Sequence, residues 1–197
     1  MKKTLISAVL AATFGLVAMQ ASASDGTITF NGTITDTTCT VTGGGAASGQ
    51  GNITVKLPTV STTSLAKDGQ TAGDTAFSLI LNCSGGSPAG KTAALWIETS
   101  QTPALDTATG ALKNQAAGGA SNVEVRMVNP ANNQRIDLSI NSAVTNGATV
   151  IAANNQPAAT IVGTTATLNY LGQYLAKGGA ATAGAVNTQL TYSMQYN

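Results

Sequence analysis

The chain has 197 residues, of which only 9% are charged, with nine basic and eight acidic side chains and no histidine. This composition provides no basic surface for nucleic acid. It also excludes any catalytic triad or dyad that depends on histidine, so we expect neither enzymatic activity nor a bound cofactor or metal ion.

The first 23 residues have the three parts of a secretory signal peptide. Met1-Lys2-Lys3 is positively charged, residues 5–19 are almost entirely apolar, and Ala21-Ser22-Ala23 supplies the small residues that signal peptidase accepts. The apolar run is short for a membrane span, although an uncleaved anchor is the alternative interpretation. We therefore predict export of residues 24–197 as one domain, with a net charge of about −1 and no membrane-spanning segment.

Residues 24–34 follow as a strand-forming arm, and the domain proper is predicted to occupy residues 35–197. Within the arm, apolar side chains and one glycine alternate with polar residues, which is the period of a β-strand. The residues that share one face are Ile28, Phe30, Gly32 and Ile34.

Cys39 and Cys83 are the only cysteines of the chain. In an exported protein, an isolated pair of this kind is expected to form one disulfide. Closing that loop would remove about 3–4.7 kcal/mol of unfolded-state entropy. Without histidine, the same two residues are a poor start for a metal site.

The rest of the chain is predicted to form short strands separated by turns. The glycine-rich segment 43–51 lacks the Lys-Ser/Thr ending of a phosphate-binding loop, so we predict a surface loop there. Turn-forming Gly, Asn and Pro residues between alternating apolar runs favour an all-β sandwich. Strands are predicted at residues 53–57, 77–81, 93–98, 123–128, 135–140, 167–175 and 186–196.

The last predicted strand, 186–196, has an unusually apolar face. Something must cover such a face, and at the edge of a sheet the strand would also be a template for pairing with another chain. The face is formed by Val186, Leu190, Tyr192, Met194 and Tyr196.

Together, these features resemble the chaperone–usher pilins, the subunits of type 1-like fimbriae. The resemblance rests on the run at residues 27–34, on the pair Cys39 and Cys83, and on the C-terminal pattern. In that pattern Gly184, fourteenth from the end, is followed by alternating apolar residues up to the penultimate Tyr196. Residues 168–174 also resemble the strand that precedes the C-terminal strand in that family.

The resemblance implies an immunoglobulin-like sandwich that lacks its final strand and therefore exposes a hydrophobic groove. In such pilins a periplasmic chaperone fills the groove during export. At the outer-membrane usher, the N-terminal arm of the next subunit replaces the chaperone, which is donor-strand exchange. Carried over to this chain, Ile28, Phe30 and Ile34 would be the donor-strand plugs.

In the same carry-over, Gly32 matches the small residue of the donor strand, where a side chain would clash with the acceptor. The acceptor groove and chaperone contact would be formed by Gly184, Val186, Leu190, Tyr192, Met194 and Tyr196.

The function implied is that of a structural subunit of a bacterial surface fimbria, exported through the periplasm and supporting cell adhesion. Its partners would be identical or related pilin subunits, the chaperone and the usher. The alternative is a minor adaptor or tip subunit, or a sugar-binding adhesin module in which Trp96 stacks on a sugar, although Trp96 also fits a buried strand position. A glycosidase-like carboxylate pair remains arithmetically possible, but most of the acidic residues stand in predicted turns.

Overall fold

The computed structural model describes residues 29–30, 39–83, 89–141 and 154–196. Contacts divide the chain into two units, residues 1–35 and 36–197, and the second unit contains all the strands described. In the first unit only Thr29 and Phe30 are described, and both are exposed and outside any strand. The predicted signal peptide and the donor residues Ile28, Gly32 and Ile34 lie outside the described residues.

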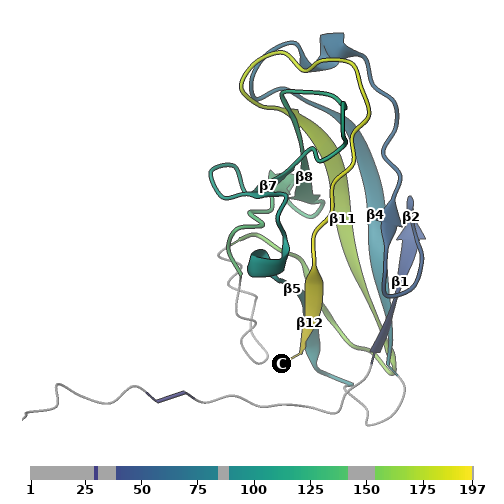
Figure 1. Ribbon diagram of the computed structural model, residues 1–197. Coiled ribbons are helices and arrows are strands. Elements are labelled where there is room, and N and C mark those ends of the chain that lie inside the picture. The colour runs from purple at the N-terminus through teal and green to yellow at the C-terminus, as the bar shows by residue number, and fades with distance from the viewer. Residues whose placement is uncertain (1–28, 31–38, 84–88, 142–153, 197) are drawn as a thin grey trace, which may run out of the picture. The chain divides into compact units, whose positions relative to one another are not determined.

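Seven strands of the second unit form one antiparallel sheet (Figure 1). Its centre is the pair β4 and β11, the two longest strands that the structure describes, and β1 and β6 lie at its edges. In sheet order the strands are β1 (Cys39–Gly45), β4 (Thr71–Cys83), β11 (Thr165–Ala176), β8 (Val123–Asn129), β7 (Ala111–Lys113) and β6 (Leu105–Asp106), with β9 (Gln134–Arg135) paired to β8.

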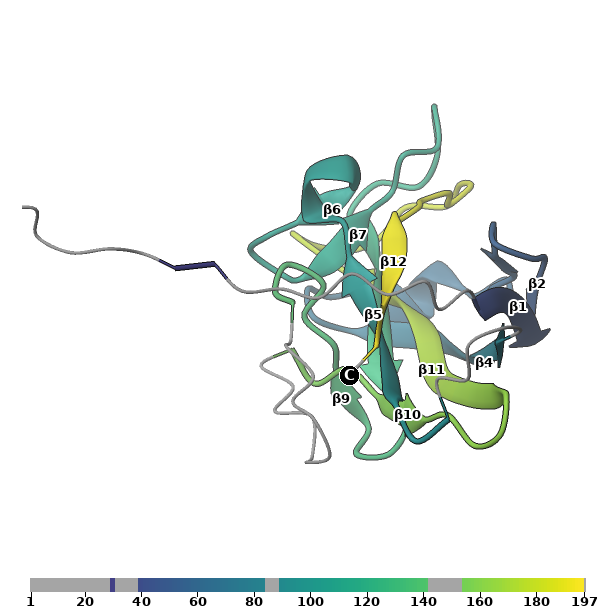
Figure 2. The same cartoon turned by 90° about the horizontal axis from the view of Figure 1, so that it is seen from below.

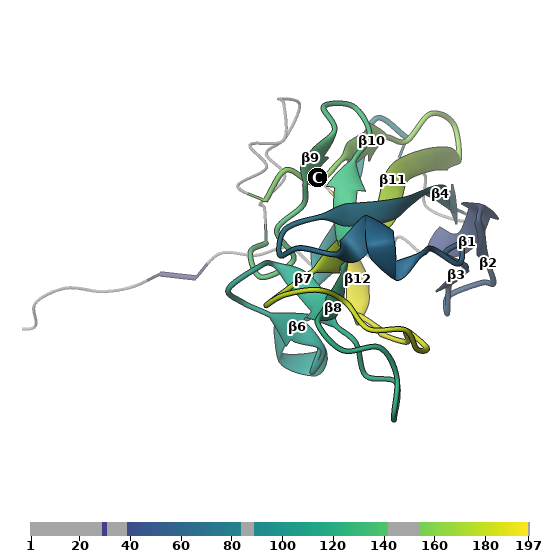
Figure 3. The same cartoon turned by 90° about the horizontal axis from the view of Figure 1, so that it is seen from above.

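A second, smaller sheet lies over the first, as views from below and above show (Figure 2, Figure 3). Its central strand β5 pairs antiparallel with a strand on each side. The three strands are β10 (Ala158–Thr160), β5 (Thr92–Ile97) and β12 (Tyr192–Tyr196). A hairpin of β2 (Ala47–Ser48) and β3 (Thr54–Val55) and the short 3-10 helices η1 (Thr62–Leu65) and η2 (Thr99–Gln101) complete the elements of the described residues.

The core lies between the two sheets and is built from alternate residues of their strands. Phe77, Leu79 and Leu81 of β4 are buried on the predicted face, and Leu95 of β5 belongs to the same cluster from the opposite sheet. The ring of Phe77 stacks on that of Tyr170 in β11, with ring centroids 5.4 Å apart. Full burial of each such side chain contributes about 1.5–3 kcal/mol, so this layer holds the sandwich together. The prediction of an all-β sandwich is confirmed.

The glycine-rich segment differs from the prediction of a surface loop. Gly43 to Gly45 continue β1, and Ala47–Ser48 form β2 directly afterwards. A Cβ atom on Gly43 would lie 2.6 Å from the backbone nitrogen of Ser48, a distance that real Cβ contacts do not reach. The absence of side chains therefore allows the chain to fold back on itself at this point.

The predicted strand at 135–140 is also mostly wrong, because only Gln134–Arg135 form a strand there. Ile136 and Leu138 are buried, as the alternation indicated. Their backbone N–H groups, however, donate to the carbonyl oxygens of Met127 and Gly110, at 2.8 and 3.0 Å, rather than to one neighbouring strand. Alternation predicted burial correctly at these positions but did not determine the hydrogen-bond partner.

In β8, burial is two-sided rather than alternating. Met127 is buried as predicted, but Glu124 and Val128 on the other face are only 4% and 1% exposed. The carboxylate of Glu124 accepts a 2.7 Å hydrogen bond from the hydroxyl of Thr109, in the turn between β6 and β7. The turn between β6 and β7 thus contacts the face of β8 that simple alternation would leave exposed to solvent.

Candidate strand-acceptor site

The C-terminal strand β12 lies at the edge of the small sheet (Figure 1). Its residues pair with β5 in antiparallel register, Tyr192 opposite Ile97 and Tyr196 opposite Ala93. Among the described residues, no strand pairs with the other edge of β12. Backbone N–H and C=O groups on such an edge are available to a further strand.

The apolar face predicted for the C-terminal segment points into the sandwich. The inward side chains along β12 and just before it are half-buried and pack against the main core, whereas Ser193 between them is exposed. Half-burial means that each of these side chains keeps apolar surface that an added strand could cover. The inward residues are Leu190, Tyr192, Met194 and Tyr196.

Gly184 and Val186 are not part of β12, because residues 184–191 form no strand. Val186 packs against a second, smaller cluster around Leu65 and Tyr174 rather than against the main core. The predicted site residues therefore divide into two groups along one segment. The predicted strand 186–196 is correct only from Tyr192 onwards.

Side chains add to a few backbone hydrogen bonds in holding residues 185–191, where no regular ladder forms. The Asn114 side chain accepts a hydrogen bond from the N–H of Asn187 at 2.9 Å and donates to the carbonyl of Ala185 at 2.9 Å. The hydroxyl of Thr102 accepts from the N–H of Thr191 at 3.1 Å. These bonds position the segment that leads into β12, and nothing in the sequence pattern around Asn114 or Thr102 predicted them.

A hollow of about 420 Å³ lies where this segment begins. It is lined on one side by residues 59–62 and on the other by residues 181–186, with Tyr174 between them. Gly184 is part of the lining, and a Cβ atom on it would lie 2.4 Å from the backbone nitrogen of Ala120. Glycine at this position thus lets residues 181–186 pack directly on the neighbouring backbone.

The chain that follows β1 approaches β12 from the large sheet. Ile53 and Val55 are half-buried and pack against the same core as the β12 row. One direct contact joins the two sides: the hydroxyl of Tyr192 donates a 2.7 Å hydrogen bond to the carbonyl oxygen of Gly51. The candidate acceptor site therefore comprises β12 together with residues 51–55, and the sequence indicated only the residues of β12.

No charged side chain interrupts the inward row of β12. Burial raises the pKa of Tyr192 and of Tyr196 above the ordinary value for tyrosine, so both phenols remain neutral at physiological pH. The nearest acidic group on the outward side, Glu98, accepts a 2.6 Å hydrogen bond from the hydroxyl of Ser193. The row is thus suited to apolar side chains rather than to a charged ligand.

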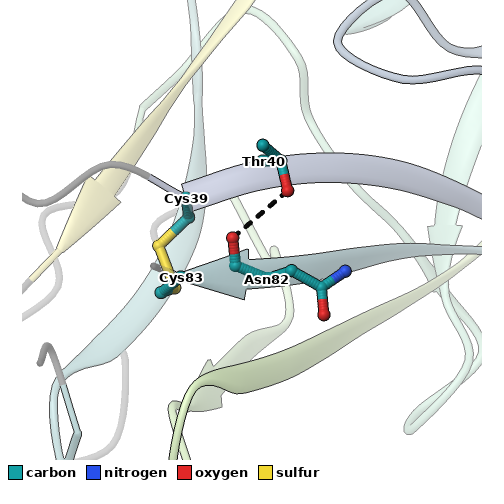
Figure 4. Close-up of a disulfide and its surroundings, with 4 residues drawn as sticks. All are labelled: Cys39, Thr40, Asn82 and Cys83. Carbon is teal, nitrogen blue, oxygen red and sulfur yellow. Dashed lines mark hydrogen bonds between the residues drawn. A yellow bond between two sulfur atoms is a disulfide. The ribbon is translucent and has the colours of Figure 1, made fainter. Parts of the chain in front are cut away.

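The predicted disulfide between Cys39 and Cys83 is present (Figure 4). It joins the first residue of β1 to the last residue of β4, which are opposite each other in the strand register, with Cα atoms 3.9 Å apart. Next to it, the hydroxyl of Thr40 donates to the carbonyl of Asn82 at 3.2 Å. The disulfide therefore fixes β1, the edge strand of the large sheet, to β4, its ladder partner among the described strands.

Of the residues predicted to be donor-strand plugs, only Phe30 is among the described residues. Phe30 is 92% exposed, an unusual state for a large apolar side chain. Trp96 of β5, considered above as a sugar-stacking residue, is 37% exposed. In the ranges that the structure describes, no helix has the length and hydropathy that a membrane crossing requires, and no cluster of three acidic or cysteine side chains is arranged to hold a metal ion.

Comparison with known proteins places residues 57–197 in the family of type-1 fimbrial proteins, A (FimA). The major fimbrial subunit SMF-1 of Stenotrophomonas maltophilia (strain K279a) is 39% identical over 91% of this chain and 96% of its own length. The F17 fimbrial protein of Escherichia coli is 37% identical over 88% of each chain. The solved structure of the CupB6 tip adhesin from Pseudomonas aeruginosa matches 71% of this chain with a TM-score of 0.50 and 20% identity. This chain covers 34% of that structure, and the likeness is one of fold alone.

Proposed function

The chain belongs to the family of type-1 fimbrial proteins, and from this premise we propose that it polymerises by accepting a strand along the free edge of β12. Its family makes it a structural subunit of a surface fimbria, not an enzyme. What the proposal adds is the route of assembly, which is donor-strand exchange between copies of this chain or related pilins.

The observation that carries the proposal is the state of β12. Among the described residues, β12 is an edge strand with an unpaired backbone edge and an uncharged, half-buried apolar row, so it is a template for pairing with another strand. An extended segment that alternates apolar and polar residues would satisfy both. Its main chain would pair with β12, and its apolar side chains would meet Leu190, Tyr192, Met194 and Tyr196.

The N-terminal arm, residues 24–34, is the segment that we assign to this role. Ile28, Phe30 and Ile34 would insert between the sheets, and the exposure of Phe30 supports its availability. Gly32 would lie where the acceptor has no room for a side chain. Gly184 and Val186 would form the far end of the acceptor groove, beside the hollow between residues 59–62 and 181–186.

Two further partners follow from the same proposal. Before assembly, a strand of a periplasmic chaperone would cover β12, since an uncovered edge of this kind promotes aggregation. An outer-membrane usher would then exchange that strand for the arm of another subunit. Residues 1–23 would be removed as a signal peptide during export, leaving an arm at residues 24–34 and a domain at residues 35–197.

The test compares two substitutions in the arm that introduce the same side chain on opposite faces. Gly32→Ile should be exported in normal amounts but should form few or no fibres, because overpacking typically costs about 1–3 kcal/mol and disturbs the neighbouring plugs. Thr33→Ile places isoleucine on the outward face and should leave fibre formation close to that of the wild type. Subunit amounts in the periplasm and negative-stain microscopy of cells provide the two readouts.

Deletion of residues 24–31 gives the complementary result. The truncated subunit should still be exported and still accept a strand, but it should terminate the fibre to which it is added. Normal fibres from the deletion variant, or from Gly32→Ile, would contradict the donor role of the arm. In cells that lack the gene, loss of whole fibres would identify the rod subunit, whereas loss of tips alone would identify an adaptor.

A further inference from the structure

The glycine-rich segment after β1 covers the free edge of that strand. The N–H of Gly51 donates to the carbonyl of Val41 at 2.8 Å, and the N–H of Gly43 donates to the carbonyl of Gly49 at 2.9 Å. An antiparallel bridge between Thr42 and residue 50 lies between these two bonds. Residues 49–51 therefore occupy the edge of β1 on the side away from β4, as a short strand would.

The backbone can fold back onto the edge of β1 in this way because the segment is rich in glycine. A Cβ atom on Gly49 would lie 2.2 Å from the carbonyl oxygen of Asn52, and Gly49 and Gly51 have φ angles of +102° and +69°. Residues with a side chain rarely adopt such positive φ angles, whereas glycine does so readily. The segment lies just before residues 57–197, the range that the family model matches.

The covered edge of β1 is tied directly to the open edge of β12. The hydroxyl of Tyr192, from the small sheet, donates its 2.7 Å hydrogen bond to the Gly51 carbonyl, from the segment bonded to the large sheet. A strand inserted between two flanking strands separates them by two strand spacings, about 9.6 Å. In the chain without an inserted strand, the Tyr192 side chain spans the distance between β12 and Gly51.

We propose that the Tyr192–Gly51 hydrogen bond is a latch that holds the acceptor opening closed in a subunit that has not yet bound any strand. The latch rests on the proposed function, since it acts on the same edge of β12. An incoming strand must break this bond before its own backbone can pair with Tyr192. The latch thus slows the addition of the first strand and shields part of the apolar row until that strand binds.

The chain offers a matched control for this idea. Tyr196 is on the same face of the same strand, and its hydroxyl makes no hydrogen bond among the described residues. Tyr192→Phe and Tyr196→Phe each remove one hydroxyl from a half-buried ring and keep the ring. Only the first removes a bond that joins the two sides of the opening.

The experiment measures association of a fluorescent synthetic peptide with the sequence of residues 24–36 to the purified, exported subunit, by anisotropy. A single neutral hydrogen bond at a partly exposed site corresponds to about a two- to fivefold change. Tyr192→Phe should therefore bind the peptide about two- to fivefold faster than the wild type, and Tyr196→Phe should match the wild type. Circular dichroism confirms that all three proteins are folded.

Equal or slower association of the peptide with Tyr192→Phe would overturn the latch while leaving strand acceptance intact. If the peptide associated equally faster with both variants, the latch would also be overturned. The effect would then come from removing any hydroxyl group, not from breaking the Tyr192–Gly51 hydrogen bond. If the wild type and both variants all fail to bind the peptide, the proposed strand acceptance is itself refuted, and the latch with it.

Discussion

Removing the disulfide should lower the free energy of unfolding by about 4 kcal/mol, the value that loop-closure entropy gives for cysteines separated by 44 residues. Cys39 and Cys83 are already opposite each other in the ladder of β1 and β4, so the bond adds little to the order of the folded state. Its main effect is therefore on the unfolded chain. For a domain of this size, the expected fall in melting temperature is about 8–16 °C.

The assay is urea unfolding of the exported subunit, followed by the fluorescence of Trp96, the only tryptophan. Three samples are compared: the oxidised wild type, the wild type reduced with dithiothreitol, and the double variant Cys39→Ala/Cys83→Ala. Reduction breaks the cross-link without changing any packing, whereas alanine also leaves a small cavity at Cys83, which is 3% exposed.

Both treatments should therefore destabilise the subunit, and the alanine pair should lose up to about 1 kcal/mol more than the reduced wild type. A loss below about 1 kcal/mol in the reduced protein would refute the reasoning, because the cross-link would then not restrict the unfolded chain as loop closure requires.

Two further changes test the interior. Burial raises the pKa of Glu124 above its ordinary value of 4.5, and neighbouring Asp106 raises it further against the opposing hydrogen bond from Thr109. The folded state thus holds this proton more tightly than the unfolded state, so the free energy of unfolding of the wild type falls as the pH rises through the raised pKa. Glu124→Gln does not titrate, and its stability relative to the wild type should therefore increase between pH 4 and pH 7. An equal difference in unfolding free energy at both pH values, measured by urea unfolding, would contradict this. The buried hydroxyl of Tyr170 has no hydrogen-bond partner among the described residues, so Tyr170→Phe should leave the unfolding free energy unchanged or raise it by about 1 kcal/mol, and a loss of that size in the same assay would reveal a partner.

The sequence was most informative where one face of a strand is buried and the other is not. Phe77, Leu79 and Leu81 alternate with half-buried or polar neighbours, and the structure places all three in the core. The same period identified the inward row from Leu190 to Tyr196. A period of two reports the side on which a residue is buried, and that information is local.

Partners that come from distant parts of the chain could not be predicted in this way. The pairing of Tyr192 with Gly51 depends on how two sheets meet, and the bonds that Asn114 makes to residues 185 and 187 depend on a turn far away in sequence. The glycine-rich segment was misread for a related reason. Turn-forming composition indicates flexibility of the isolated chain, whereas Gly43 is required by a close backbone approach that only the folded structure creates.

The position of β12 also determines when the domain can finish folding. Its partner β5 lies in the first half of the chain, and β4 likewise waits for β11, so both central pairings join segments that are synthesised far apart in time. Such non-local pairings fold slowly, because loop-closure entropy must be overcome before the contacts stabilise the chain. A nascent subunit therefore keeps the edge of β5 that pairs with β12 without a partner until residues 192–196 emerge. The order of synthesis thus leaves a strand edge open to wrong pairing during the whole interval before β12 is made.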